Sequence, residues 1–143
     1  MQLLASEEYG LRCLLQVACS AGASPISIAG IAESEGLSPE YTAKLMRMLR
    51  LGGIVESVRG AGGGYRLSRP AAQITVWSAL QALGGEFFYQ DFCACHPGQR
   101  RRCVRVDNCS IRALWRTLQS GAQQTLEEVS LEDLLCDERP VAG

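Results

Sequence analysis

The sequence predicts a mainly α-helical protein with one small β-hairpin: a winged helix-turn-helix followed by a long helix. Three observations predict this class. Between residues 27 and 50, a short helical segment, a turn and a longer helix with a basic outer face follow one another. A glycine-rich hairpin follows directly, as in a wing. A lone amphipathic segment at 110–129 then continues past the domain and needs a partner surface.

The first helix is expected to open at Ser6, whose hydroxyl can cap the turn that carries Glu7 and Glu8. Apolar residues then recur at helical spacing until the Gly- and Pro-containing break at 21–25. Cys13 and Cys19 are expected to be small core residues of this helix.

The next two segments have the start and stop signals of short helices. Ser27 can cap the first, whose apolar positions are expected to face inward, and Gly36 can adopt the left-handed turn that ends it. The run Ser38-Pro39-Glu40 provides a cap, a proline at the first helical position and an acid in the first turn. The apolar stripe of this second helix is Tyr41, Leu45, Met48 and Leu49, and the opposite face carries Glu40, Ala43, Lys44, Arg47 and Arg50.

The hairpin is predicted from two strand-like runs, 54–59 and 65–68, around the glycine-rich turn 60–64. Arg59 and Arg66 flank its tip, where side chains of a wing enter a minor groove or contact phosphates. A basic helix face can simply be a solvent-exposed surface with no binding role. The adjoining wing favours DNA binding for this one.

Charge is segregated along the chain although the net charge is only -1. Residues 36–70 contain six basic and two acidic residues, and residues 91–117 contain six arginines and two aspartates. Each block therefore carries +4, and the acidic remainder balances them. The first basic block coincides with the predicted helix-turn-helix and wing, which supports a nucleic-acid partner.

Composition excludes several classes of protein. The 143 residues are 47% hydrophobic, enough for one packed domain, and no apolar run approaches the length of a membrane span. The amino terminus lacks a basic region before an apolar one, so we expect a cytoplasmic protein. With one histidine and no nucleophile–base constellation, we expect no enzyme.

Beyond the wing, residues 74–83 are predicted to form a helix capped near Thr75 that packs beneath the hairpin. Ser130 and Asp133 have the form of a capping box and open a last helical turn. The expected organisation is a DNA-binding domain at 1–85, a cysteine-rich loop at 86–109, a long helix with a short C-terminal helix at 110–135, and a tail at 136–143.

Four cysteines and the only histidine fall within residues 93–109, among four arginines of the same loop. In a reducing compartment this composition indicates metal or redox chemistry rather than disulfides. An iron–sulfur centre needs mainly thiolates, and Cys93 or Cys95 with Cys103 and Cys109 supply three. Structural zinc favours close cysteine pairs, which this loop lacks. A metal-free thiol switch is the third possibility.

The run from Ser57 to Leu67 resembles the wing signature of the Rrf-type winged-helix transcriptional regulators, the family of the iron–sulfur cluster regulators IscR, NsrR and RirA. Residues 37–49 resemble the family's recognition helix. Cys103 and Cys109 followed by 111–115 resemble its cluster loop and dimerisation helix. This resemblance covers about residues 1–135, and its wing motif is quite specific.

The resemblance implies a homodimer whose affinity for a two-fold DNA site depends on a bound [2Fe-2S] or [4Fe-4S] cluster. It places Cys93 (or Cys95), Cys103 and Cys109 at the three cysteine ligands. It also implies that the recognition helix enters the major groove and the wing meets the minor groove, through Ser38, Glu40, Tyr41, Ala43, Lys44, Arg47, Arg59, Gly60, Gly62, Gly63 and Arg66.

The chain departs from the family at two positions. One branch has a histidine three residues after the last cysteine, but Arg112 stands there and cannot bind iron. The fourth ligand is therefore open between Glu8, which matches a carboxylate that another branch donates across the dimer, and the local residues His96 and Cys95. Ala43 replaces a base-reading glutamate of some relatives, so the preferred DNA sequence should differ.

The sequence thus predicts a transcriptional regulator whose DNA affinity follows a cluster that senses redox state, iron or cluster status, or nitric oxide. The alternative is a cluster-independent winged-helix regulator that uses the cysteine loop for thiol redox, zinc or small-ligand sensing. An iron–sulfur carrier or redox enzyme fits less well, because it would leave the wing unexplained.

Overall fold

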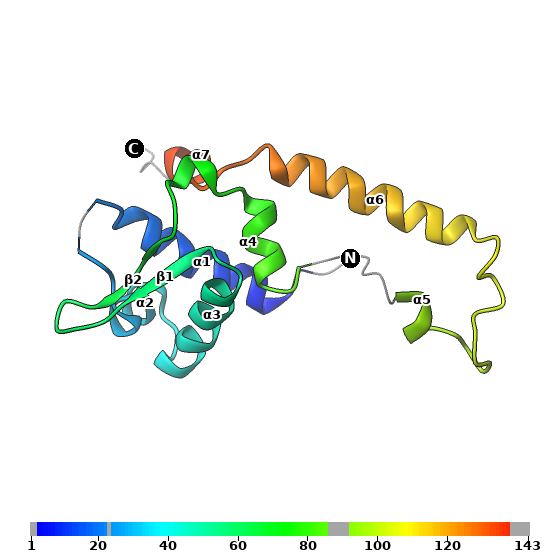
Figure 1. The fold of residues 1–143 in the computed structure, drawn as a ribbon, viewed down its shortest axis with the longest axis horizontal. Helices are drawn as coiled ribbons and strands as arrows, with labels where there is room; N and C mark the ends of the chain where they lie inside the picture. Colours follow the sequence, from blue (N-terminus) through cyan, green and yellow to red (C-terminus); the bar gives the residue numbers. More distant parts are fainter. Residues whose placement is uncertain (1–2, 23, 86–91, 138–143) are drawn as a thin grey trace.

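The computed structural model describes residues 3–22, 24–85 and 92–137. Within them the chain forms helices, one short 3-10 turn and one antiparallel hairpin, with α6 extending away from the body (Figure 1). The elements in chain order are α1 (Ala5–Cys19), α2 (Ile28–Glu35), α3 (Pro39–Leu51), β1 (Val55–Val58), β2 (Gly64–Leu67), η1 (Ala71–Gln73), α4 (Val76–Ala82), α5 (Phe92–Cys95), α6 (Ser110–Glu127) and α7 (Leu131–Asp137). The predicted fold class is confirmed, and residues 86–91 and 138–143 of the predicted loop and tail lie outside the described residues.

The core lies where α1, α2 and α3 meet the hairpin and α4. Leu14, Ile31 and Leu45 are fully buried there, one from each of the first three helices. This is the outcome expected when helices present one apolar stripe each and bury it against their neighbours.

Three of the predicted helix caps are confirmed. The hydroxyls of Ser27, Ser38 and Thr75 accept the backbone N–H three residues ahead, at 3.1 Å in each case. Gly36 ends α2 in the left-handed conformation, with φ 67°. These local signals determine where α2, α3 and α4 begin or end, because each satisfies a backbone group that the helix leaves unpaired.

The predicted start of the first helix is wrong by two residues. The helix begins at Ala5, and Leu4 occupies the cap position. The Glu7 carboxylate, inside the first turn, accepts the backbone N–H of the cap residue Leu4 at 2.8 Å, and this contact rather than a Ser6 cap marks the start of the helix. Cys13 is buried as predicted, whereas Cys19 at the end of α1 is exposed, so its predicted place in the core is also wrong.

The two strands pair antiparallel with Val55 opposite Leu67 and Val58 opposite Gly64. Gly63 is required at the end of the turn, because a Cβ there would lie 2.3 Å from the Val58 carbonyl oxygen. The base of the hairpin is tied to the segment before α2 by two hydrogen bonds between the backbones of Ile26 and Tyr65, at 2.8 and 3.1 Å. The wing is therefore held on the helix-turn-helix.

The long helix contacts α4 and leads into α7, which returns to the body (Figure 1). Leu131 donates its N–H to the Ile74 carbonyl at 2.9 Å, and its side chain is fully buried in the core. The predicted capping box is present: Ser130 and Asp133 exchange hydrogen bonds at 2.9 and 3.1 Å. The backbone N–H of Ser130, more than its hydroxyl, lowers the pKa of the Asp133 carboxyl.

Candidate DNA interface and candidate metal centre

The solvent-facing side of α3 carries the predicted recognition residues. Lys44, Arg47 and Arg50 are exposed, one or two turns apart on the helix, and Glu40 is exposed in its first turn. Ser38 is exposed at the cap, and Ala43 is half-buried. An exposed basic face on the second helix of a helix-turn-helix is the geometry that enters a major groove.

Tyr41 has a second role that the sequence did not indicate. Its ring meets the ring of Tyr9 on α1 edge-on, with centroids 6.1 Å apart and planes at 82°. The Arg12 guanidinium lies over the ring of Tyr9, 5.2 Å from its centroid. The first turn of α3 is thus packed directly against α1.

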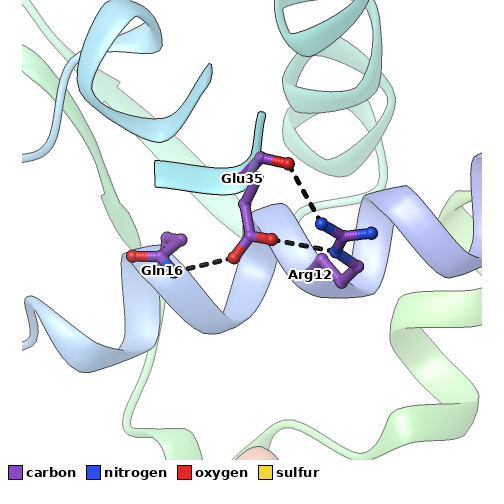
Figure 2. A network of polar contacts seen from close by, with 3 residues as sticks. All are labelled: Arg12, Gln16 and Glu35. Atoms are coloured by element: carbon purple, nitrogen blue, oxygen red, sulfur yellow. Dashed lines mark hydrogen bonds and ion pairs between the residues drawn. The ribbon is translucent and has the colours of Figure 1, made fainter. Parts of the chain in front are cut away.

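A polar network joins α1 to the end of α2 (Figure 2). Arg12 Nε donates to the Glu35 carboxylate at 2.9 Å, and its Nη2 donates to the Glu35 carbonyl at 3.0 Å. Gln16 donates to the second carboxylate oxygen at 2.7 Å. The hydrogen bond with Glu35 raises the pKa of Arg12. Sequence reasoning missed this network; its only local signal is the i, i+4 spacing of Arg12 and Gln16.

The three arginines of the wing differ in their partners. Arg59 is exposed beside the tip, next to the exposed Gly60 and Gly62 and the half-buried Gly63. Arg66 forms an ion pair with Glu56, its neighbour across the hairpin, at 2.6 Å. Arg69 donates to the Gly53 and Gln73 carbonyls at 3.2 Å and so secures the base of the hairpin.

An open cavity of ≈ 160 Å³ lies between the cysteine loop and the first turns of α6. It is lined by Cys93, His96, Cys103, Arg105, Cys109, Ile111, Arg112 and Trp115. The structure therefore brings together three of the predicted sulfur ligands and one fourth-ligand candidate. Cys95 is exposed and does not line this cavity. Among the described residues, no three His, Cys, Asp or Glu side chains stand close enough to hold a metal ion.

Cys109 also begins the long helix. Its Sγ accepts the N–H of Arg112 at 3.3 Å, which makes it the N-cap of α6. A candidate ligand is thus part of the structure of the helix that follows it. Cys13, the buried cysteine of α1, is separate from this chemistry, since burial raises the pKa of its thiol to about 11.

Glu8 lies on a different surface. It contributes to a cavity of ≈ 580 Å³ between α1, α4 and α6, whose walls are mainly apolar. Apolar lining residues include Leu11, Leu80 and Leu118. Within one chain the structure does not place Glu8 at the cavity of the cysteine loop.

Nothing in the described part of the chain is both long and apolar enough for a helix that would cross a membrane. This agrees with the sequence, in which apolar runs are short.

Curated relatives cover nearly all of this chain. The HTH-type transcriptional regulator IscR of Vibrio atlanticus is 35% identical over 137 residues, which cover 96% of this chain and 76% of the relative. The protein of the same name from Escherichia coli O1:K1 is 33% identical over 135 residues, covering 94% of this chain and 80% of the relative.

Solved structures of regulators share the fold. T. potens IscR has a TM-score of 0.78 at 28% identity and covers 100% of this chain and 93% of that one. CymR, the global cysteine regulator of B. subtilis, has a TM-score of 0.73 at 26% identity, covering 97% and 99%. The family model Rrf2, described as iron-dependent transcriptional regulators, matches residues 4–137. The chain therefore belongs to the Rrf2 family, and it is a DNA-binding transcriptional regulator rather than an enzyme.

Proposed function

We propose that this regulator binds a two-fold DNA site as a homodimer, and that an iron–sulfur cluster on its cysteine loop controls the affinity. The observation that carries the proposal is the cavity lined by Cys93, Cys103, Cys109 and His96. This function would be cytoplasmic, because a cluster on reduced thiols and contact with chromosomal DNA both require that compartment.

On the DNA side, α3 would enter the major groove and the wing would meet the neighbouring minor groove. The exposed Lys44 and Arg47 support this assignment, since cationic side chains at the front of a recognition helix reach base edges and phosphates. Ser38 and Glu40 would lie at the helix end nearest the bases. Arg59, with Gly60, Gly62 and Gly63 beside it, would approach the minor groove closely.

On the metal side, the donor set fits a cluster. Thiolates are the usual ligands of iron–sulfur centres, and a cluster of several atoms is held by ligands that need not converge on one ion. Arg105 and Arg112 line the same cavity and would offset the negative charge of bound thiolates. Cys93 is preferred over Cys95 as the first ligand because only Cys93 lines the cavity.

The fourth ligand is assigned to His96 within one chain, because it lines the cavity with the three cysteines. Glu8 would reach a cluster only from the partner protomer, and Cys95 only after a change in the loop. When bound, the cluster supplies a group whose oxidation state and integrity respond to redox conditions, iron supply and nitric oxide.

Dimerisation would use α6. Ile111, Leu114, Trp115 and Leu118 are large apolar side chains, each 39–52% exposed on this helix. Such a face together with the apolar groove beside it is expected to be covered by a second copy. Cys109 caps the start of α6, and the other end of α6 contacts α4. A change in the cysteine loop would therefore change the orientation of the helix that joins the two DNA-binding domains of the proposed dimer.

The decisive experiment is anaerobic purification followed by visible absorption and analysis of iron and sulfide. We expect a brown protein with both elements present. Cys103→Ala should abolish the colour, whereas the matched variant Cys136→Ala should retain it. A colourless wild-type protein that carries zinc, or that carries no metal, would refute the cluster.

Single substitutions of Glu8, His96 and Cys95 test the fourth ligand. We expect only His96→Ala to change the absorption spectrum of the purified protein. A change with Glu8→Ala instead would assign this ligand to the partner protomer.

A further inference from the structure

Glu56 and Arg66 lie directly opposite each other in the hairpin, on its solvent face. The register pairs them across the ladder, and Arg66 Nε donates to Glu56 Oε1 at 2.6 Å. Their side chains are 48% and 63% exposed, so both remain accessible to a partner. Their neighbours Val55 and Leu67 contact the core from the other face, which holds the pair outward.

The remaining cations of the wing show why this pair matters. Arg69 is committed to carbonyl groups of Gly53 and Gln73 at the base. Arg59 makes no hydrogen bond or ion pair with any residue that the structure describes. Of the three arginines, Arg59 is therefore available to phosphates, Arg69 is structural, and Arg66 is neutralised by a carboxylate.

We propose that Glu56 weakens the binding of the wing to DNA, because its ion pair with Arg66 keeps that arginine from contacting a phosphate. The inference rests on the proposed contact between wing and DNA. Glu56 then affects the affinity for DNA indirectly, through Arg66. The wing would make one phosphate contact, from Arg59, whereas the sequence suggests two, from Arg59 and Arg66.

Two anions, the Glu56 carboxylate and a DNA phosphate, compete for the guanidinium of Arg66. The ion pair is exposed and therefore weak, so the attraction between the two side chains is not by itself enough to keep Arg66 from a DNA phosphate. Exchange of the carboxylate for a phosphate, however, leaves Glu56 unpaired beside the phosphate backbone, where like charges repel. Replacing Glu56 with the neutral glutamine removes both the competitor and the repulsion while preserving the shape of the side chain.

The test measures binding to a labelled duplex selected from a random pool by the wild-type protein, over a series of salt concentrations. Glu56→Gln should bind about two to five times more tightly. Its plot of log affinity against log salt should steepen by about 0.9, the contribution of one added phosphate contact. Glu128→Gln makes the same charge change at the end of α6 and should alter neither quantity.

A double-mutant cycle assigns the effect to Arg66. Arg66→Ala in the wild-type background should weaken binding less than twofold, whereas in the Glu56→Gln background it should cancel the whole gain. Unchanged affinity and slope in Glu56→Gln would overturn the inference, as would a gain that persists without Arg66. If Arg59→Ala weakens binding while Glu56→Gln does nothing, this inference fails alone. If Arg59→Ala also has no effect, the proposed wing contact itself fails.

Discussion

Residues of one type divide into separate roles according to what surrounds them. Cys13 is sealed in the core, where its raised pKa keeps it a neutral thiol. Cys93 and Cys103 line the cavity of the loop, and Cys109 combines that position with a helix cap. The arginines divide in the same way, between Arg12 in a network and Arg59 in solvent. The residue type alone does not assign these roles, because burial and neighbouring groups determine the protonation state and the contacts of each side chain.

The exposed arginine of the wing gives the first prediction. Arg59→Ala should weaken DNA binding and lower the salt slope by about 0.9, because one phosphate contact is lost. Fluorescence anisotropy over several salt concentrations measures both. Arg100→Ala removes the same charge from the cysteine loop and should leave the slope unchanged. Equal slopes for Arg59→Ala and wild type would show that the wing does not contact DNA.

The network of Arg12 and Glu35 gives a second prediction. Arg12→Ala and Glu35→Ala should each lower the melting temperature, and the double variant should lower it by less than the sum of the two single losses. The reason is that both substitutions remove the same ion pair, between Arg12 Nε and the Glu35 carboxylate, and this loss counts only once in the double variant. Calorimetry measures the three values, and additive losses would contradict the coupling.

At the scale of elements, helix ends connect the parts of the molecule. The network of Figure 2 fixes the end of α2 to α1, immediately before the turn that leads into α3. The start of α6 is fixed by the Cys109 sulfur, and its far end is followed by α7, which returns to the core. The half of α6 near Cys109 lies far from the body (Figure 1), so its order depends on its own cap and on a partner surface.

The cap of α6 is tested in metal-free protein. Cys109→Ala should destabilise the first turn by about 1 kcal/mol, whereas Cys109→Ser should preserve it, because a serine hydroxyl accepts the same N–H. Hydrogen exchange of the Arg112 amide reports the difference directly. The matched pair Cys103→Ala and Cys103→Ser should show no such difference. Equal exchange in both Cys109 variants would mean that the sulfur does not stabilise the helix.

At the scale of the whole molecule, the proposed dimer would combine two DNA-reading surfaces, one from each chain. Its recognition helix and wing lie on the body, while its exposed apolar helix projects away from it (Figure 1). A two-fold dimer through α6 would place two recognition helices at half-sites about one helical turn or more apart. The cysteine loop immediately precedes that helix, so it is positioned to change the spacing.

Dimerisation gives the fourth prediction. Leu118→Asp should shift the protein to a monomer and reduce affinity for two-fold DNA, because it places a charge in the apolar face that α6 offers a partner. Ser120→Asp adds the same charge on another side of the helix and should remain dimeric. Sedimentation velocity separates the two species, and a Leu118→Asp protein that stays dimeric would exclude this face as the interface.

Much of the fold was predictable because its signals are local. Three helices begin at capping hydroxyls, those of Ser27, Ser38 and Thr75, and such caps are visible in the sequence itself. The hairpin is equally local, because it consists of two short strands around a glycine-rich turn. Ser6 failed as a cap because the Glu7 carboxylate bonds the Leu4 N–H and starts the helix earlier. Cys19 failed as a core residue because it sits in the last position of α1 and faces solvent.

The sequence by itself determined the winged helix-turn-helix, the basic recognition face and the family, since helix caps, periodicity and a glycine-rich wing act over a few residues. Only the tertiary structure decided that Glu56 holds Arg66, that Arg12 joins α1 to Glu35, and that Cys93 rather than Cys95 lines a cavity with Cys103, Cys109 and His96. These contacts depend on which faces of separate elements meet, and that is set by packing of the whole chain rather than by any local pattern.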